Sequence, residues 1–178
     1  AAAGKNHATL RNLKITGEIT ASDFLFMRDE MEALQALNLK EVRIKAGSAG
    51  AYPEIVKCKD AQIPYYAFKE KTSLTSMVLP DKLTSIGEAA FEHCHNLTGS
   101  LIIPEGVVDI QRSAFSECRS LTGKLSLPST LRYLGNGEDA SGNIDVAAGM
   151  EWSYYTGVFT DCGFSCELLL PDNMELIG

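Results

Sequence analysis

The sequence contains no uninterrupted apolar stretch of the roughly 18 residues that a membrane-spanning helix requires. Its first seven residues also lack the apolar core of a secretory signal peptide. Basic residues are scarce, because 16 lysines and arginines stand against 23 aspartates and glutamates and give a formal net charge of -7. Nucleic acids and anionic membranes are bound through positive surfaces, so this charge argues against both as partners.

Signatures of catalysis and of metal binding are also missing. No Gly-x-Ser-x-Gly motif and no glycine-rich phosphate loop occurs, so we expect no enzyme activity and no cofactor. Residues 139–145 alternate like the start of a calcium loop, but the glycine and the closing glutamate of such loops are absent. We therefore predict no metal site, and we interpret His93 and His95 as surface residues.

What the sequence does contain is an internal repeat. The segment from Ile86 to Leu97 is echoed from Ile110 to Leu121 at an offset of 24 residues, and each copy holds an Ala-Phe pair followed by a cysteine. A short apolar run ending in proline follows each copy, as at Leu101-Ile102-Ile103-Pro104. Such a period is typical of a solenoid in which each turn packs only against its neighbours.

The amino-terminal part carries a related pattern, Leu10-x-x-Leu13-x-Ile15, which recurs 24 residues later. This is the Leu-x-x-Leu-x-Leu core of leucine-rich repeats. Between the two copies, Thr20 and Asp23 have the spacing of a capping box, and apolar residues then recur at helical intervals. We predict a helix from Asp23 to Ala36.

These patterns predict an α/β solenoid: a right-handed leucine-rich-repeat superhelix of about six turns with one short parallel β-strand per turn. The predicted strand centres lie near residues 14, 38, 78, 102, 126 and 169. We interpret residues 1–178 as a single domain. It comprises initial repeats with one helix and the first insertion (1–62), regular repeats (63–134), an insertion (135–156) and a final incomplete repeat (157–178).

In a strand with the pattern Leu-x-Leu, the outer residues point to one face and the middle residue to the other. Leu101 and Ile103 should therefore point inward and Ile102 outward. The outward middle positions form a row of candidate binding residues on the expected concave face: Lys14, Asn38, Val78, Ile102, Ser126 and Leu169. Adjacent exposed aliphatic residues favour partner binding, and the alternative is that they only satisfy β-propensity or lie under an insertion.

The second insertion combines a glycine-rich acidic stretch with the aromatic residues Trp152, Tyr154 and Tyr155. Aromatic side chains offer a large contact area to a carbohydrate or protein ligand, so these three are further candidate binding residues. The alternative is that they pin the insertion to the side of the solenoid. Insertions in solenoids usually project from one face.

The five cysteines do not indicate a disulfide framework, because their odd number leaves at least one unpaired. Cys94, Cys118 and Cys162 share one repeat position, which a series of small buried apolar side chains explains. Cys162 and Cys166 have no matching pair and no nearby histidines, which argues against zinc, and a local disulfide between them stays open in an oxidising compartment.

The chain resembles the BspA-like leucine-rich-repeat family of bacterial surface proteins, through Ile86-x-x-x-Ala90-Phe91-x-x-Cys94-x-x-Leu97, its copy at Ile110 to Leu121, and the Pro80, Pro104, Pro128 series. The resemblance implies an exported protein at the cell surface or outer membrane, with a role in adhesion, and supplies no catalytic residues. The last repeat departs from the pattern, because Val158-Phe159 replaces Ala-Phe and Ser165 occupies the leucine position.

Two functions follow as hypotheses. The first is extracellular recognition of a host or bacterial protein or glycan through the concave face and the insertions. The second is a structural spacer or assembly domain of a larger surface protein, with self-association at the carboxyl-terminal edge, where Leu176 and Ile177 fall in the middle of a repeat.

Overall fold

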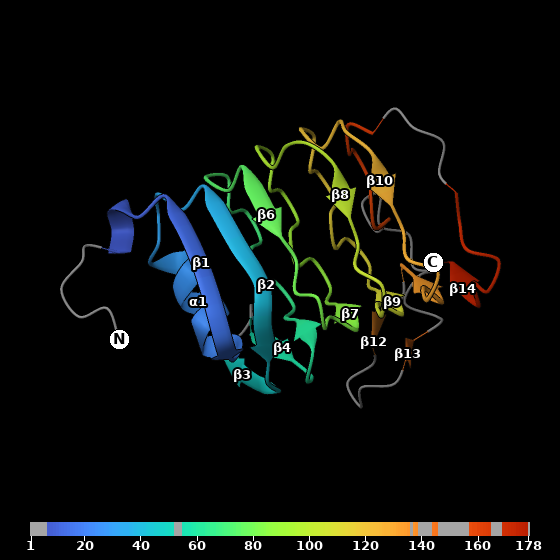
Figure 1. The fold of residues 1–178 in the computed structure, drawn as a ribbon, viewed down its shortest axis with the longest axis horizontal. Helices are drawn as coiled ribbons and strands as arrows, with labels where there is room; N and C mark the ends of the chain where they lie inside the picture. The colour runs from blue at the N-terminus through green and yellow to red at the C-terminus, as the bar shows by residue number, and fades with distance from the viewer. Residues whose placement is uncertain are drawn as a thin grey trace.

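In the computed structural model, the chain winds into successive turns that stack along the long axis of the molecule (Figure 1). The structure describes residues 7–51, 55–135, 137–138, 144–145, 157–164 and 169–177. A short 3-10 helix, η1 (His7–Thr9), precedes strand β1 (Asn12–Ile19) at one end of the stack, and β14 (Leu176–Ile177) lies at the other end. The predicted solenoid of parallel strands is confirmed.

Five strands follow one another along one side of the solenoid, and we call them the first ladder: β1, β2 (Ala36–Ile44), β6 (Ser76–Val78), β8 (Leu101–Ile102) and β10 (Leu125–Ser126) (Figure 1). The first three form one parallel sheet, and β8 and β10 form a parallel pair. Five of the predicted strand centres are thereby confirmed. The sixth is not, because Leu169 lies outside any strand in the final repeat, where the sequence departs from the pattern.

A second ladder of parallel strands runs along another side of the solenoid: β5 (Gln62–Ile63), β7 (Ser85–Ile86), β9 (Asp109–Ile110), β11 (Tyr133–Leu134) and β14. The prediction of a single strand per turn is corrected here, since a regular turn contributes one strand to each ladder. Alternation could not predict this ladder, because a two-residue strand is too short to show it. The repeat positions Ile86 and Ile110 supply fully buried side chains to it.

The remaining side of each turn carries the Ala-Phe pairs. Their side chains are fully buried, and the rings of successive turns stack, with centroids 5.5 Å apart for Phe68 and Phe91 and 5.1 Å apart for Phe91 and Phe115. Backbone hydrogen bonds link the same turns, as from the Phe91 N–H to the Ala114 carbonyl at 2.8 Å. The small alanines let the backbones approach closely, so the phenylalanines form a continuous core.

Cys94 and Cys118, which lie on this side, are buried and act as hydrogen-bond donors. The Cys94 thiol donates to the Phe68 carbonyl of the preceding turn, and the Cys118 thiol donates to the Phe91 carbonyl, both at 3.1 Å. This arrangement agrees with the interpretation of the shared cysteine position as structural. Each thiol therefore satisfies a carbonyl oxygen in the core while it packs as a small apolar group.

The single α-helix, α1 (Ala21–Asp29), starts and ends earlier than the predicted span from Asp23 to Ala36. Its start follows the expected capping signal, since the Asp23 carboxylate accepts hydrogen bonds from the Thr20 N–H at 2.8 Å and the Thr20 hydroxyl at 3.0 Å. The apolar residues beyond it do not continue the helix. Met31 and Leu34, which are both buried, instead bracket a turn that is closed by the hydrogen bond from the Leu34 N–H to the Met31 carbonyl at 3.1 Å.

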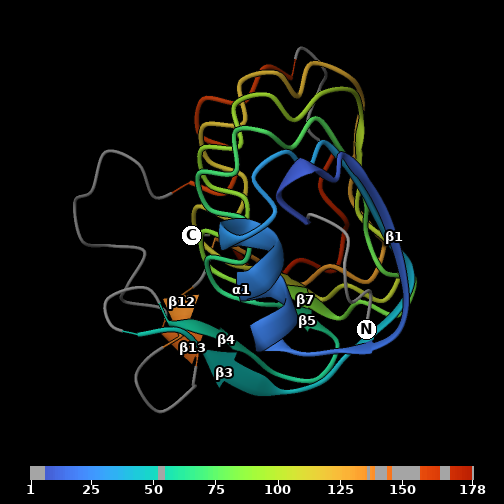
Figure 2. The same cartoon turned by 90° about the vertical axis from the view of Figure 1, so that its left-hand side faces the viewer.

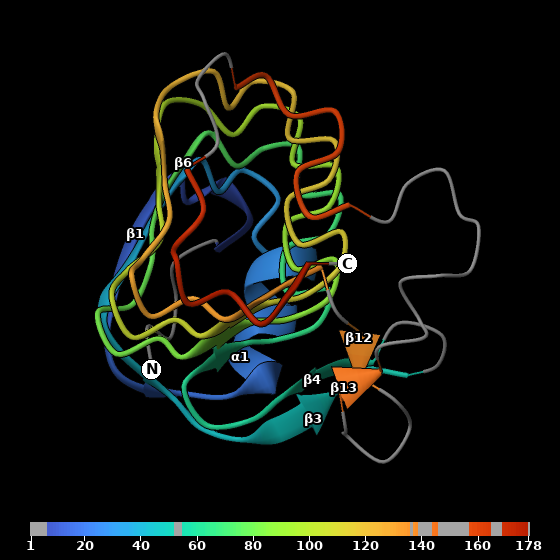
Figure 3. The same cartoon turned by 90° about the vertical axis from the view of Figure 1, so that its right-hand side faces the viewer.

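Both insertions contain an antiparallel hairpin. Strand β3 (Gly47–Ala49) pairs with β4 (Val56–Cys58), and β12 (Gly137–Glu138) pairs with β13 (Ile144–Asp145). End-on views from either end of the solenoid show the two hairpins projecting from the same edge (Figures 2 and 3). The expectation that the insertions share one side of the molecule agrees with this placement.

Candidate interaction surface

The outward row of the first ladder is assembled in two registered parts. Lys14, Asn38 and Val78 are register partners across β1, β2 and β6. Ile102 and Ser126 are register partners across β8 and β10. Among the described residues no sheet pairing joins β6 to β8, so Val78 and Ile102 lie on consecutive turns without being direct cross-strand partners.

The alternation along β8 agrees with the predicted orientation. Leu101 and Ile103 are buried at 5% and 3% exposure, whereas Ile102 between them is 67% exposed. Val78 is 44% exposed on the turn before. The side chains of Val78 and Ile102 thus project into solvent, while the residues next to them along the chain pack towards the core. Such a rigid, exposed apolar pair is a feature of protein interaction surfaces.

Leu169 adds a third exposed aliphatic side chain, at 75% exposure, although it does not belong to a strand. With Leu170 and Leu127 it lines an open surface depression of about 520 Å³, whose polar lining includes Glu105 and Asp172. Because Leu127 immediately follows β10, this depression places Leu169 and Leu170 next to the last strand of the first ladder, within a lining that is mostly polar.

The opposite end of the row is polar. The Lys14 ammonium donates to the Glu41 carboxylate at 2.7 Å. This hydrogen bond, with the positive charge of Lys14, lowers the pKa of Glu41 below its ordinary value. Lys14 is therefore engaged in an exposed ion pair, and the aliphatic part of the row, rather than Lys14, is the part available for hydrophobic contact.

The aromatic candidates Trp152, Tyr154 and Tyr155 lie outside the described residues, as do Cys166 and most of residues 139–145. Their proposed contacts stay predictions.

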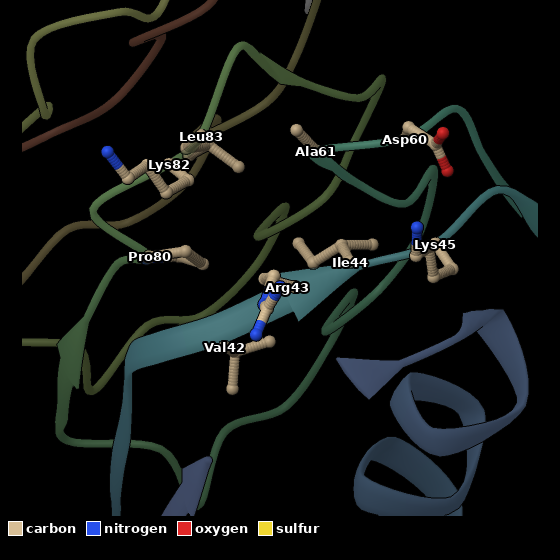
Figure 4. A pocket seen from close by; sticks show the side chains of 9 residues that line it. All are labelled: Val42, Arg43, Ile44, Lys45, Asp60, Ala61, Pro80, Lys82 and Leu83. Atoms are coloured by element: carbon tan, nitrogen blue, oxygen red, sulfur yellow. The ribbon is translucent and has the colours of Figure 1, made fainter. Parts of the chain in front are cut away.

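A small pocket of about 210 Å³ lies between the end of β2 and the following turn, and its lining includes Arg43, Lys45, Asp60 and Lys82 (Figure 4). The basic groups do not converge on one point, because the Lys82 amino group lies on the far side of the pocket from that of Lys45 (Figure 4). The Asp60 carboxylate accepts a hydrogen bond from the Ala46 N–H at 2.8 Å and so holds the start of the first hairpin. This pocket is therefore assigned a structural role.

The described cysteines are poor candidates for a nucleophile. Burial raises the pKa of the Cys94 thiol to about 12 and that of the Cys162 thiol to about 11. Burial also raises the pKa of the Cys58 and Cys118 thiols. A thiol must ionise to attack a substrate, so these groups stay protonated and unreactive near neutral pH.

The structure brings together three side chains whose proximity was not predicted from the sequence. His93, His95 and Glu117, which come from adjacent turns, have side-chain nitrogen and oxygen atoms all within 4.8 Å of one another. With Glu92, Ser116 and Arg119 they line a surface pocket of about 370 Å³. The signal was present, because Glu117 follows His93 by the 24-residue period and must therefore lie beside it in the next turn.

Comparison with known proteins agrees with the repeat assignment. Residues 61–140 match a protein-family model described as "BspA type Leucine rich repeat region (6 copies)". No curated protein matches the chain. Within the described part of the chain, no helix has both the length and the apolar character needed to cross a membrane.

Proposed function

Because the chain carries a BspA-type leucine-rich-repeat region, we propose that it is an extracellular binding module that recognises a protein or glycan on a host or bacterial surface. Solenoids of this type are typically binding scaffolds rather than enzymes, since their extended faces present many side chains in fixed register. The proposed location is the outside of the cell, as expected for an adhesion-type protein of this family.

The observation that carries the proposal is the exposed aliphatic row on the first ladder. Ile102 is 67% exposed while both of its neighbours along the strand are buried, and Val78 is exposed on the turn before. Because strand pairing already holds the backbone of these residues in place, burial of their side chains against a partner costs little additional conformational entropy. The net charge of -7 favours a neutral or cationic partner.

The test is a binding screen of the purified protein against extracellular-matrix proteins and glycans, run beside the double variant Val78→Asp/Ile102→Asp. Both side chains already face water, so the thermal midpoint should stay nearly unchanged. We expect a ligand that binds the wild-type protein and is lost in the double variant.

The matched control is Val108→Asp, since Val108 is also an exposed aliphatic residue, at 37%, but lies next to the second ladder rather than in the row. It should bind as the wild type does. Equal loss in the control and the double variant would argue that added negative charge, rather than the row, disturbs binding. No ligand at high micromolar concentration would argue against the recognition function.

A second candidate function is that of a structural spacer or assembly domain. It is favoured by strands that have a single partner among the described strands, such as β1, which pairs with β2, and β14, which pairs with β11. An unpaired edge is a template for a strand of another copy. Light scattering should then show an oligomer that dissociates when Leu176 and Ile177 are replaced by polar residues, and a monomer at high concentration would exclude this function.

A further inference from the structure

We propose that His93, His95 and Glu117 form a binding site for a divalent transition-metal cation of the zinc class. The site lies on the side of the solenoid that carries the Ala-Phe pairs, outside the exposed row of the first ladder. The proposal therefore stands independently of the recognition function.

The fold brings the three side chains together through the repeat. His93 and Glu117 occupy the same position in consecutive turns, two residues after the core phenylalanines Phe91 and Phe115. Both have left-handed backbone conformations, with φ of 59° and 62°. The His93 N–H donates to the Ser116 carbonyl at 2.9 Å and fixes the spacing of the two turns. The positions of His93 and Glu117 are thus set by the backbone, as a preformed site requires.

His95 is oriented as metal-binding histidines usually are. Its Nδ1 lies 2.9 Å from the Glu117 carbonyl oxygen, which can only accept a hydrogen bond, so Nδ1 carries the proton. With Nδ1 as the donor to this carbonyl, Nε2 is the ring nitrogen left to bind a cation. A backbone carbonyl that holds one ring nitrogen and leaves the other for the metal is a common supporting contact in metal sites. The His93 ring stands edge-on to the His95 ring, with centroids 5.4 Å apart.

Glu117 supplies a negative charge in a nearly buried position, at 5% exposure. The Arg119 guanidinium lies 2.5 Å from Oε2 of Glu117 on a side chain that is itself 64% exposed. A cation would replace Arg119 as the charge partner of Glu117, and the exposed arginine is free to turn into solvent.

The chemistry of the three ligand atoms determines which class of cation would bind. Two imidazole nitrogens and one carboxylate suit Zn²⁺ and similar transition metals, whereas Ca²⁺ and Mg²⁺ prefer six or more oxygen ligands. Metal–nitrogen bonds of about 2.1 Å in tetrahedral geometry place ligand atoms about 3.4 Å apart. The ligand atoms of the three side chains lie within 4.8 Å of one another, so binding of a metal would draw them closer together. Three protein ligands would leave the fourth position of the metal to water or to a group of a partner molecule.

The test is isothermal titration calorimetry of the full chain with Zn²⁺ at neutral pH under reducing conditions, with Co²⁺ absorption spectroscopy as a second readout. We expect one Zn²⁺ per chain, a tetrahedral Co²⁺ spectrum, and no measurable binding of Mg²⁺. The variants are His93→Asn, which tolerates the left-handed backbone, His95→Gln and Glu117→Gln. Each should weaken Zn²⁺ binding by at least about tenfold, the loss that removal of even a supporting group can cause.

Two controls separate this site from others. His7→Gln removes the third histidine of the sequence, which lies beside Phe26 and Glu30 near the amino-terminal end, and should leave Zn²⁺ binding unchanged. Arg119→Ala removes the guanidinium that competes with the metal for Glu117, so this variant should bind Zn²⁺ more tightly. Binding that survives the combined variant His93→Asn/His95→Gln in a chain with a normal thermal midpoint would overturn the proposal, as would a wild-type chain that binds no Zn²⁺ at millimolar concentration.

Discussion

The Lys71 ammonium nitrogen lies 2.7 Å from the Met31 carbonyl oxygen and 2.8 Å from the carbonyl oxygen of Arg28. Lys71 occupies the repeat position that holds a cysteine in later turns, where the thiol donates to a carbonyl of the preceding turn. Here the preceding turn contains the helix α1, whose last carbonyls lack intrahelical partners. A longer, charged donor therefore replaces the thiol and satisfies two carbonyls at once.

Replacement of this lysine by a chain of similar length without donors should be strongly destabilising. Lys71→Met removes the donor to the Arg28 carbonyl and the second hydrogen bond of the Met31 carbonyl, which still accepts the Leu34 N–H, and we expect a loss of about 1–3 kcal/mol in the free energy of unfolding. Urea denaturation monitored by circular dichroism measures it. The control Lys124→Met alters an exposed lysine and should change stability by less than about 0.5 kcal/mol. Equal losses in both variants would mean that general charge, rather than the carbonyl contacts, determines the effect.

The buried thiols should make stability depend on pH in the alkaline range. Burial raises the pKa of Cys94 to about 12 and also raises that of Cys118, whereas unfolded thiols ionise near pH 8.5. Folded-state values above the unfolded value mean that the stabilisation is fully present below about pH 8.5 and is lost as pH rises towards the folded value. Each thiol should contribute a slope of at most about 1.4 kcal/mol per pH unit.

Urea denaturation under reducing conditions at a series of alkaline pH values measures this slope. In the double variant Cys94→Ala/Cys118→Ala the slope should be shallower, because two of the groups that cause it are gone. Parallel curves for the wild type and the variant would show that other groups cause the alkaline loss of stability.

The ring of Phe91 is the centre of the phenylalanine core, stacked between Phe68 and Phe115. Phe91→Ala removes a fully buried side chain and leaves a cavity that the neighbouring rings cannot fill, so we expect a loss of about 3–5 kcal/mol. Phe26→Ala is the control: Phe26 is 45% exposed, so its replacement should lower the free energy of unfolding much less. Thermal and urea denaturation distinguish the two, and similar costs would contradict the assignment of Phe91 to the core.

Gly123 marks a close approach of two turns. A Cβ atom there would lie 2.6 Å from the carbonyl carbon and oxygen of Gly99, both backbone atoms that cannot rotate away. Gly123→Ala should therefore destabilise the protein by about 1–3 kcal/mol through overpacking. Gly47→Ala is the control, because nothing lies within 4 Å of a Cβ at that position. A stable Gly123→Ala variant would mean that the turns are farther apart in solution.

The parts of the fold that depend on a pattern repeated over many residues could be predicted from the sequence. The 24-residue period and the Leu-x-Leu pattern predicted the first ladder and the outward direction of Ile102, because alternation depends only on strand geometry. The helix boundary was wrong, because Met31 and Leu34 have helical spacing but close a separate turn. Local spacing cannot show that Lys71, some 40 residues later, donates to a carbonyl at the end of α1 and to another just beyond it.

The candidate sites were predicted less completely. The row of Lys14, Asn38 and Val78 follows directly from the repeat, and the structure places these residues in register. His93 and His95 were interpreted one residue at a time, as surface residues. Their proximity to Glu117 can be predicted only by comparing each repeat position with the position 24 residues later, because these two positions lie side by side in consecutive turns.

The stacking of the turns also has a mechanical consequence. Residues of one turn are held mainly by the turns directly before and after it, so tension applied between β1 and β14 would act on a series of similar interfaces. Such a chain should lengthen in steps rather than rupture at once, with each released turn of 24 residues adding about 80 Å of extended polypeptide. A protein built in this way can yield under shear and keep its remaining turns folded.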